Sequence, residues 1–166
     1  FNKIEDLYNI ASIMKFVISQ LRLGNSSIMR MYVSPDNENS SVNMLHFSQT
    51  GLGLPDRDYY FKSDSATLAI QNAYKKYLAT LFTLSEQKDA EKNASIVYGI
   101  ETKLAAAHKT RVERRDVKSN YNKIAVAAID KKLSNIGWKN VLNQLNLKAD
   151  SIDIKQIGYY TALDSL

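Results

Sequence analysis

The two histidines, His46 and His108, are the side chains best suited to metal binding or proton transfer. They lie far apart in the sequence, and neither belongs to a His-Glu-x-x-His pattern, which places two imidazoles one helical turn apart around zinc. A zinc site needs about three protein ligands in one place, and the sequence has no such cluster and no cysteine. We therefore interpret both histidines as structural and predict no catalytic, cofactor-binding or metal-binding residue in this chain.

The glycines and carboxylates of residues 51–58 also have simpler interpretations than catalysis. Gly51-Leu52-Gly53 lacks the third glycine and the strand-to-helix context of a dinucleotide-binding loop. Asp56 and Asp58 flank Arg57, so we expect a local salt-bridged turn. A catalytic carboxylate pair would need an apolar pocket to raise the pKa of one member, and the sequence indicates no such pocket.

Ten tyrosines offer a further kind of chemistry, recognition through an amphipathic ring. The pairs Tyr59-Tyr60 and Tyr159-Tyr160 fit either an interaction surface or a core position with the hydroxyl at the surface. We favour the core position for most of them.

Composition limits the elements that can position these residues. The chain of 166 residues is about one domain long. Six glycines and two prolines favour long helices over many turns. No apolar run reaches the roughly 18 residues of a membrane span. Because the chain begins at Phe1 without a signal-like segment, we expect it to be part of a larger protein.

The net charge of +5 is compatible with a nucleic-acid or membrane-surface partner. The lysines, however, are scattered among acidic residues. The one compact arginine cluster, Arg111, Arg114 and Arg115, lies beside Glu113 and Asp116. A salt-bridged helix face explains this pattern, and we predict no nucleic-acid partner.

Apolar periodicity predicts a mainly α fold, a helical domain fragment with one small β-hairpin near residues 28–49. Gly24 suits the C-terminal cap of the first helix, and Ser65 is expected to cap the second. An irregular connector, residues 51–60, follows the hairpin. The predicted helices cover residues 3–23, 65–84, 86–117, 124–133, 138–145 and the tail from Tyr159, and residues 151–157 are predicted as a short strand.

Several segments together resemble the neprilysin and endothelin-converting enzyme family of zinc metalloendopeptidases, with the bacterial oligopeptidases most similar. They occur in the family's order and cover most of residues 30–125, with a weaker match to about residue 165. The segments are Asn39–Gln49, Gly51-Leu52-Gly53-Leu54-Pro55-Asp56-Arg57-Asp58-Tyr59-Tyr60, Ile100-Glu101-Thr102-Lys103-Leu104-Ala105, and Glu113-Arg114-Arg115-Asp116 followed by Tyr121-Asn122.

The resemblance implies that residues 1–166 are a single helical domain in the N-terminal lid region of a larger peptidase. In the family, the His-Glu-x-x-His helix and its zinc belong to a separate catalytic domain, and no position here matches them. The chain alone is therefore expected to be inactive. Its partners would be the catalytic domain of the same polypeptide and short peptide substrates, in the periplasm or outside the cell.

Two other functions remain open from the residues alone. One is a freestanding peptide- or protein-binding helical module without enzymatic activity, which would use Tyr-rich and Arg-bearing surface. The other is a basic helical nucleic-acid binder, for which the sequence has no recognisable module.

Overall fold

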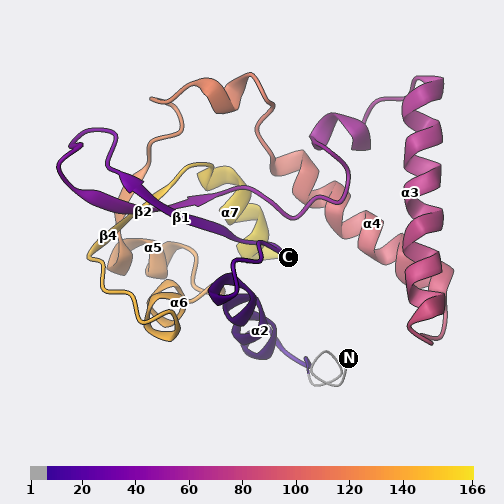
Figure 1. Ribbon diagram of the computed structural model, residues 1–166, viewed down its shortest axis with the longest axis horizontal. Helices are drawn as coiled ribbons and strands as arrows, with labels where there is room; N and C mark the ends of the chain where they lie inside the picture. The colour runs from indigo at the N-terminus through magenta and orange to yellow at the C-terminus, as the bar shows by residue number, and fades with distance from the viewer. Residues whose placement is uncertain (1–6) are drawn as a thin grey trace. The chain divides into compact units, whose positions relative to one another are not determined.

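A computed structural model describes residues 7–166 and divides the chain into two compact units. Unit 1 combines the residues up to Gly51 with Asp116–Leu166, and unit 2 is the intervening Leu52–Arg115. Unit 1 contains α2 (Ile10–Arg22), β1 (Arg30–Pro35), β2 (Asn43–Ser48), β3 (Lys123–Ala125), α5 (Val126–Lys132), α6 (Trp138–Gln144), β4 (Ser151–Ile154) and α7 (Ile157–Ser165) (Figure 1). Unit 2 contains the 3-10 turn η1 (Arg57–Tyr60), α3 (Ser65–Leu84), α4 (Ala90–Ala107) and the 3-10 turn η2 (Glu113–Arg115).

Local signals at both ends fix helix α2. Asn9 accepts the backbone N–H of Ser12, and Ser12 Oγ in turn accepts the backbone N–H of Asn9, which is a capping box. At the other end Gly24 has a φ of +80°, as the predicted glycine cap requires. Of the helix predicted over residues 3–23, residues 3–6 lie outside the described part of the chain, and within the described part helix α2 begins at Ile10.

The predicted hairpin exists as β1 and β2, but it is half of a four-stranded sheet. The strand order is β1-β2-β4-β3, with β2 and β4 parallel and the other two pairs antiparallel. The mainly α prediction is confirmed, whereas the prediction of one small β-hairpin is incomplete, because the hairpin pairs with two further strands. Strand β4 corresponds to the short strand predicted from residue 151, and the three-residue β3 lies where a helix was predicted. The pairing of these strands joins distant parts of the sequence, which a local pattern does not reveal.

The core of unit 1 lies between the sheet and its helices, and Figure 1 shows α5 and α6 below the strands. Phe47 of β2 meets Trp138 of α6 edge to face, with ring centroids 5.0 Å apart. Tyr160 of α7 packs against both rings. The hydroxyls of Tyr159 and Tyr160 donate to the carbonyls of Ile28 and Ser48. Both tyrosines are thus core residues as predicted, but their hydroxyls are bonded inside the unit and not at its surface.

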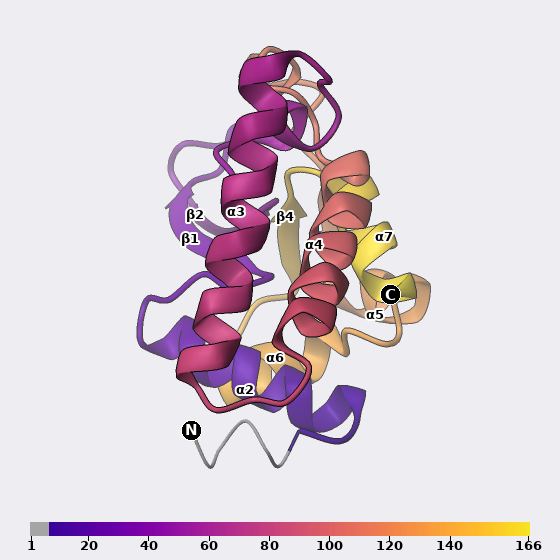
Figure 2. The same ribbon diagram turned by 90° about the vertical axis from the view of Figure 1, so that its right-hand side faces the viewer.

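Unit 2 is built on an antiparallel hairpin of α3 and α4, which run side by side in Figure 2. The bounds predicted for α3 are confirmed, although Asp64 and not Ser65 is its cap, because the Asp64 carboxylate accepts the N–H of Thr67. Helix α4 begins at Ala90 and not at residue 86, and it ends at Ala107 and does not continue to residue 117 as predicted. The physical reason is a second capping box, in which Thr110 and Glu113 bond each other's backbone N–H groups.

The C-terminal third confirms the helix predicted near residues 138–145 and the helical tail. The helix predicted over residues 124–133 is a strand followed by a helix, because residues 123–125 pair with β4. The strand predicted over residues 151–157 ends at Ile154. None of the helices within residues 7–166 combines the length and hydropathy that crossing a membrane requires.

Candidate functional site

A polar row crosses the sheet of unit 1, with one residue on each strand. The register places Tyr32 opposite His46, His46 opposite Asp153, and Asp153 opposite Lys123. Successive side chains of a strand point to opposite faces, so this row lies on the face away from Phe47. The sheet thus has one apolar face toward its helices and a polar row on the other.

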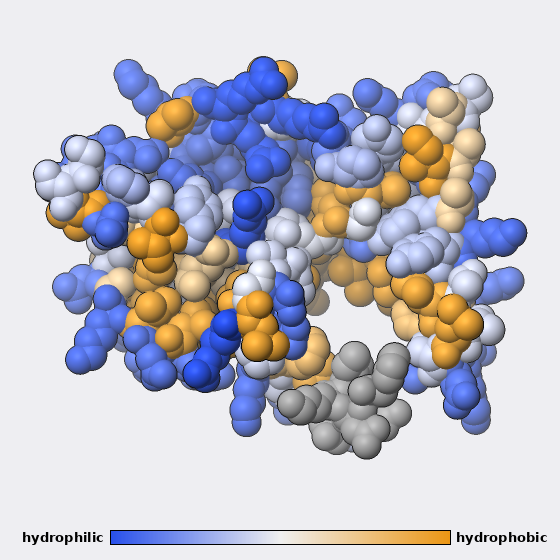
Figure 3. All heavy atoms as spheres, viewed as in Figure 1, coloured by the Kyte–Doolittle hydropathy of each residue, from blue (hydrophilic) through white to orange (hydrophobic). Residues whose placement is uncertain are grey.

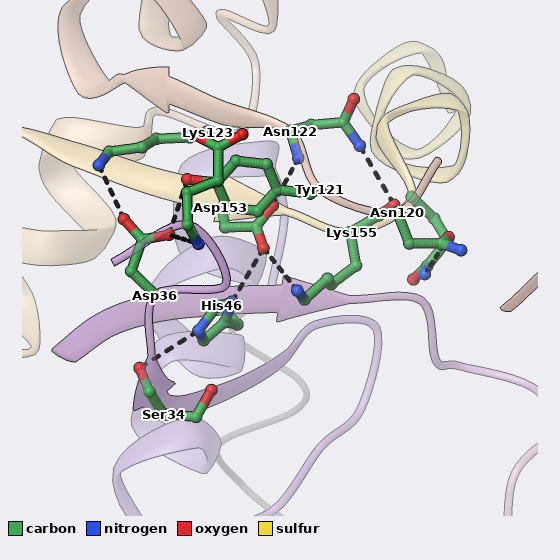
Figure 4. A network of polar contacts seen from close by, with 11 residues as sticks. Ser34, Asp36, His46, Asn120, Tyr121, Asn122, Lys123, Asp153 and Lys155 are labelled. Atoms are coloured by element: carbon green, nitrogen blue, oxygen red, sulfur yellow. Dashed lines mark hydrogen bonds and ion pairs between the residues drawn. The ribbon is translucent and has the colours of Figure 1, made fainter. Parts of the chain in front are cut away.

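His46 is fully buried in this row. Its Nδ1 lies 2.9 Å from Asp153 Oδ2, and its Nε2 lies 3.3 Å from the carbonyl oxygen of Ser34 (Figure 4). Its ring stacks on that of Tyr32, with the ring centroids 5.1 Å apart. Both ring nitrogens are thus directed at protein oxygen atoms, a carboxylate on one side and a backbone carbonyl on the other, and not at an open metal position.

Asp153 is the centre of the network and is also fully buried. Its carboxylate accepts the backbone N–H of Asn122 at 2.7 Å and contacts the Lys155 ammonium at 2.7 Å, in addition to His46. A buried carboxylate is stable when it is paired and fully hydrogen-bonded. Asp153 therefore joins β2, β4 and the segment before β3.

A second buried carboxylate, Asp36, lies in the loop between β1 and β2. It accepts hydrogen bonds from the Lys123 ammonium at 2.8 Å, the Tyr121 hydroxyl at 2.7 Å and the Glu38 N–H at 3.1 Å. These bonds, that of Lys123 foremost, lower the pKa of Asp36 to about 2. Burial and the bond to Asp36 raise the pKa of Tyr121. Figure 4 shows this cluster beside that of Asp153. The Lys155 ammonium lies 5.9 Å from the centre of the Tyr121 ring.

This network was not predicted from the sequence, although the sequence contains one signal for it. Asp153 lies between Ile152 and Ile154, and all three side chains are buried. A carboxylate within a strand that is buried on both faces needs a buried partner. The partners themselves come from segments too distant for a sequence pattern to reveal.

In unit 2, the connector is held by hydrogen bonds to one glutamate of α4. The hydroxyls of Tyr60 and Tyr74 donate to the Glu101 carboxylate at 2.7 and 2.8 Å. Tyr60 also accepts the Leu54 N–H at 3.1 Å. Burial, followed by the bond to Glu101, raises the pKa of both tyrosines. A Cβ at Gly53 would lie 1.8 Å from the Tyr74 hydroxyl oxygen, so a larger residue in the connector would have to displace the Tyr74 side chain.

The salt-bridged turn predicted around Arg57 is wrong in its partners. Asp56 caps η1 through the Asp58 N–H and pairs with Arg111 at 2.7 Å, while Asp58 lies 3.8 Å from Lys62. The Arg57 guanidinium lies over the Phe61 ring, 5.7 Å from its centre. Its buried Nε has no hydrogen-bond partner among the described residues.

These charges line part of a polar pocket of about 550 Å³ in unit 2. The pairs made by Asp56 and Asp58 already neutralise two of its carboxylates, and the Asp64 carboxylate caps α3. These three carboxylates of the pocket are therefore already paired with a cation or used as a helix cap. It is lined by Asp56, Asp58, Tyr59, Lys62, Asp64, Ala66, Thr67, Ile70 and Arg111.

The described residues do not fit a zinc ion. His46 lies in unit 1 with both nitrogens occupied, and His108 is buried at the C-terminal cap of α4 in unit 2. Within residues 7–166 no group of three or more His, Cys, Asp or Glu side chains is placed to hold a metal. The polar clusters of both units serve to hold distant segments of backbone together.

Comparisons with known proteins point to one family. The sequence profile of the N-terminal region of peptidase family M13 matches residues 2–166. Mouse endothelin-converting enzyme-like 1 is 30% identical over 122 residues, and guinea-pig endothelin-converting enzyme 1 is 31% identical over 123 residues. Each alignment covers 72% of this chain but 16% of the relative. The chain thus spans about a sixth of the length of these relatives.

Solved structures agree with the sequence matches. The Mycobacterium tuberculosis zinc metalloprotease Zmp1 in its open state superposes with a TM-score of 0.86 at 27% identity, covering 99% of this chain and 26% of that one. PepO from Lactobacillus rhamnosis has a TM-score of 0.78 at 15% identity over 96% of this chain, which is a likeness of fold alone.

Proposed function

The chain belongs to peptidase family M13, and we propose that it is part of the non-catalytic lid of a zinc metalloendopeptidase. In this proposal residues 1–166 are one portion of the N-terminal helical domain, and both units belong to it. The lid restricts access of short peptides to an active site carried by another part of the same polypeptide. The zinc belongs to that other part, and the protein acts in the periplasm or outside the cell.

One observation carries the proposal. Nearly the whole chain matches the N-terminal profile of the family and superposes on Zmp1, yet it accounts for 26% of that structure. The remaining three quarters leave room for a separate catalytic domain.

The polar clusters support a role in shape. A lid excludes water and large substrates from an active site and positions those that enter. Such a role depends on rigid backbone, and in unit 1 the buried carboxylates of Asp36 and Asp153 join segments on either side of the inserted unit 2, Asp36 through Tyr121 and Lys123 and Asp153 through His46. In unit 2 Glu101 and Gly53 hold the connector against the helices.

The test compares peptides of graded length in the intact protein. A lid should allow rapid cleavage of a short peptide and exclude the same sequence placed within a folded carrier protein. Equal cleavage of both would contradict a gating role. Equilibrium dialysis of the 166-residue chain should also show no tight zinc binding, and stoichiometric binding would favour a metal centre within it.

A further inference from the structure

Unit 2 exposes an apolar strip along both helices of its hairpin. On α3 the exposed residues recur at helical spacings, and on α4 two isoleucines lie one turn apart. Figure 3 shows apolar side chains gathered over the surface formed by α3 and α4. We call this strip the apolar flank: Ile70, Tyr77, Leu81, Leu84, Ile96 and Ile100.

The exposed apolar residues of α3 and those of α4 lie on the same side of the hairpin. The inward sides of the helices are marked by the buried Gln71 and Leu78 of α3 and by Glu101, which reaches Tyr74 across the interface. On both helices an exposed apolar residue directly precedes an inward one, as Tyr77 precedes Leu78 and Ile100 precedes Glu101. A residue that directly precedes an inward one is rotated from it by about −100° around the helix axis. Because both helices are right-handed and run antiparallel, this rotation places the exposed apolar residues of α3 and those of α4 on the same flank of the hairpin.

The opposite flank differs in character. It carries Lys75 on α3 and Ser95 and Thr102 on α4, with Leu68 as an exposed apolar exception. A helix surface that is apolar on one side and polar on the other is normally buried on its apolar side. Large contiguous apolar patches on a surface mark interaction sites.

We propose that the apolar flank is the docking surface for an amphipathic helix of the same polypeptide, from the part outside residues 1–166. The connector covers part of the hairpin through Leu54 and Tyr60, but the apolar flank is exposed, and a stable helical layer buries its apolar face against a second layer. A third helix lying along the groove between α3 and α4 supplies that layer by ridge-into-groove packing. The relatives have polypeptide to supply it, since this chain covers 26% of Zmp1. The inference rests on the proposed function, because it takes the chain to be part of a longer peptidase.

Leu81 and Leu68 give a matched pair for the test. Both are leucines of α3, and they are 43% and 42% exposed. Leu68 directly follows the buried Thr67, so it lies on the opposite flank. Lysine keeps the helix propensity high at either position. Each variant, Leu81→Lys and Leu68→Lys, is made in the 166-residue chain and in the intact protein.

In the isolated chain both substitutions should leave the midpoint of thermal unfolding nearly unchanged, because surface changes are usually small. In the intact protein Leu81→Lys should speed amide hydrogen exchange along α3 and α4 about tenfold, since local opening is no longer opposed by the docked helix. Leu68→Lys should change it less than about twofold.

Three outcomes would overturn the proposal. Equal effects of the two variants in the intact protein would show that the flank is not covered. A lower midpoint for Leu81→Lys in the isolated chain would show that residues 1–166 cover the flank themselves. Self-association of the chain that Leu81→Lys abolishes, with no effect in the intact protein, would identify a second copy as the occupant. Cleavage of peptides of graded length is a separate measurement. If it contradicts the lid function, the hydrogen-exchange comparison of the two variants still tests the docking surface.

Discussion

Replacing Asp153 by asparagine removes the charge at the centre of the unit 1 network while keeping its shape. The carboxylate is fully buried and accepts from His46, Lys155 and the Asn122 N–H. Breaking a buried ion pair on one side costs about 3–5 kcal/mol, because the opposite charge stays buried and unpaired. Asparagine retains one accepting oxygen, so we expect about 3 kcal/mol. For a chain of this size that lowers the unfolding midpoint by about 10 °C.

The assay is urea unfolding followed by tryptophan fluorescence. Trp138 is the one tryptophan of the sequence and is buried in the core of unit 1. Its signal therefore reports the unit that contains Asp153. Asp150→Asn, at an exposed aspartate just before β4, is the control and should change the free energy of unfolding by less than about 0.5 kcal/mol.

A double-mutant cycle separates the ion pair from general damage. Lys155→Met removes the ammonium that contacts Asp153 at 2.7 Å. Residues that interact directly have coupling energies of about 0.5–3 kcal/mol, so the double variant should be more stable than the sum of the single losses. A loss below about 1 kcal/mol for Asp153→Asn, or strict additivity with Lys155→Met, would show that the buried ion pair does not stabilise unit 1.

Three further predictions concern the remaining clusters. Gly53→Ala should destabilise unit 2 by about 1–3 kcal/mol, measured by circular dichroism, because the new methyl group displaces the Tyr74 hydroxyl. The lowered pKa of Asp36 means that its stabilising contribution is present above about pH 4 and is lost as pH falls toward 2; Asp36→Asn should flatten the acid limb of urea midpoints measured against pH. The raised pKa of Tyr60 means that its contribution is present below about pH 10 and is lost as pH rises above it; Glu101→Gln should shift the tyrosinate absorbance transition to lower pH.

Each of these has an internal control. Gly99 lies within α4, and a Cβ there meets nothing within 4 Å, so Gly99→Ala should stabilise the helix by about 0.5–1 kcal/mol. If Gly53→Ala also leaves unit 2 as stable as before or more stable, the close approach of Gly53 to Tyr74 does not restrict the residue at this position. An acid limb that Asp36→Asn leaves unchanged would assign acid unfolding to other carboxylates. A tyrosinate transition that does not respond to Glu101→Gln would show that burial alone sets it.

Sequence patterns succeeded where structure depends on neighbouring residues. The amphipathic period of residues 65–84 and the cap at Gly24 are local features, and the structure matches them. The prediction that the helix continues beyond Ala107 was wrong, although a local signal against it was present. Thr110 and Glu113 have the spacing of a capping box, which marks the start of a new turn.

The polar networks could not be predicted in the same way. Asp153 was assigned to a strand from its alternating neighbours, but its contact with His46 depends on a parallel pairing of β2 with β4. The register of such a pairing is set by burial on both faces of the sheet, which no single segment encodes. Glu101 falls within the helix predicted over residues 86–117, and only the fold brings it to Tyr60 and Tyr74.

The insertion of unit 2 into unit 1 has a consequence for biosynthesis. His46 and Asp153 are separated by 107 positions in the sequence, so β2 leaves the ribosome long before its neighbour β4. Closing such a long loop is slow compared with forming a helical hairpin. Unit 2 can therefore complete its local contacts first, while one edge of β2 waits unpaired. An unpaired strand edge is a site for aggregation, so the nascent chain is most vulnerable in the interval between the synthesis of β2 and that of β4.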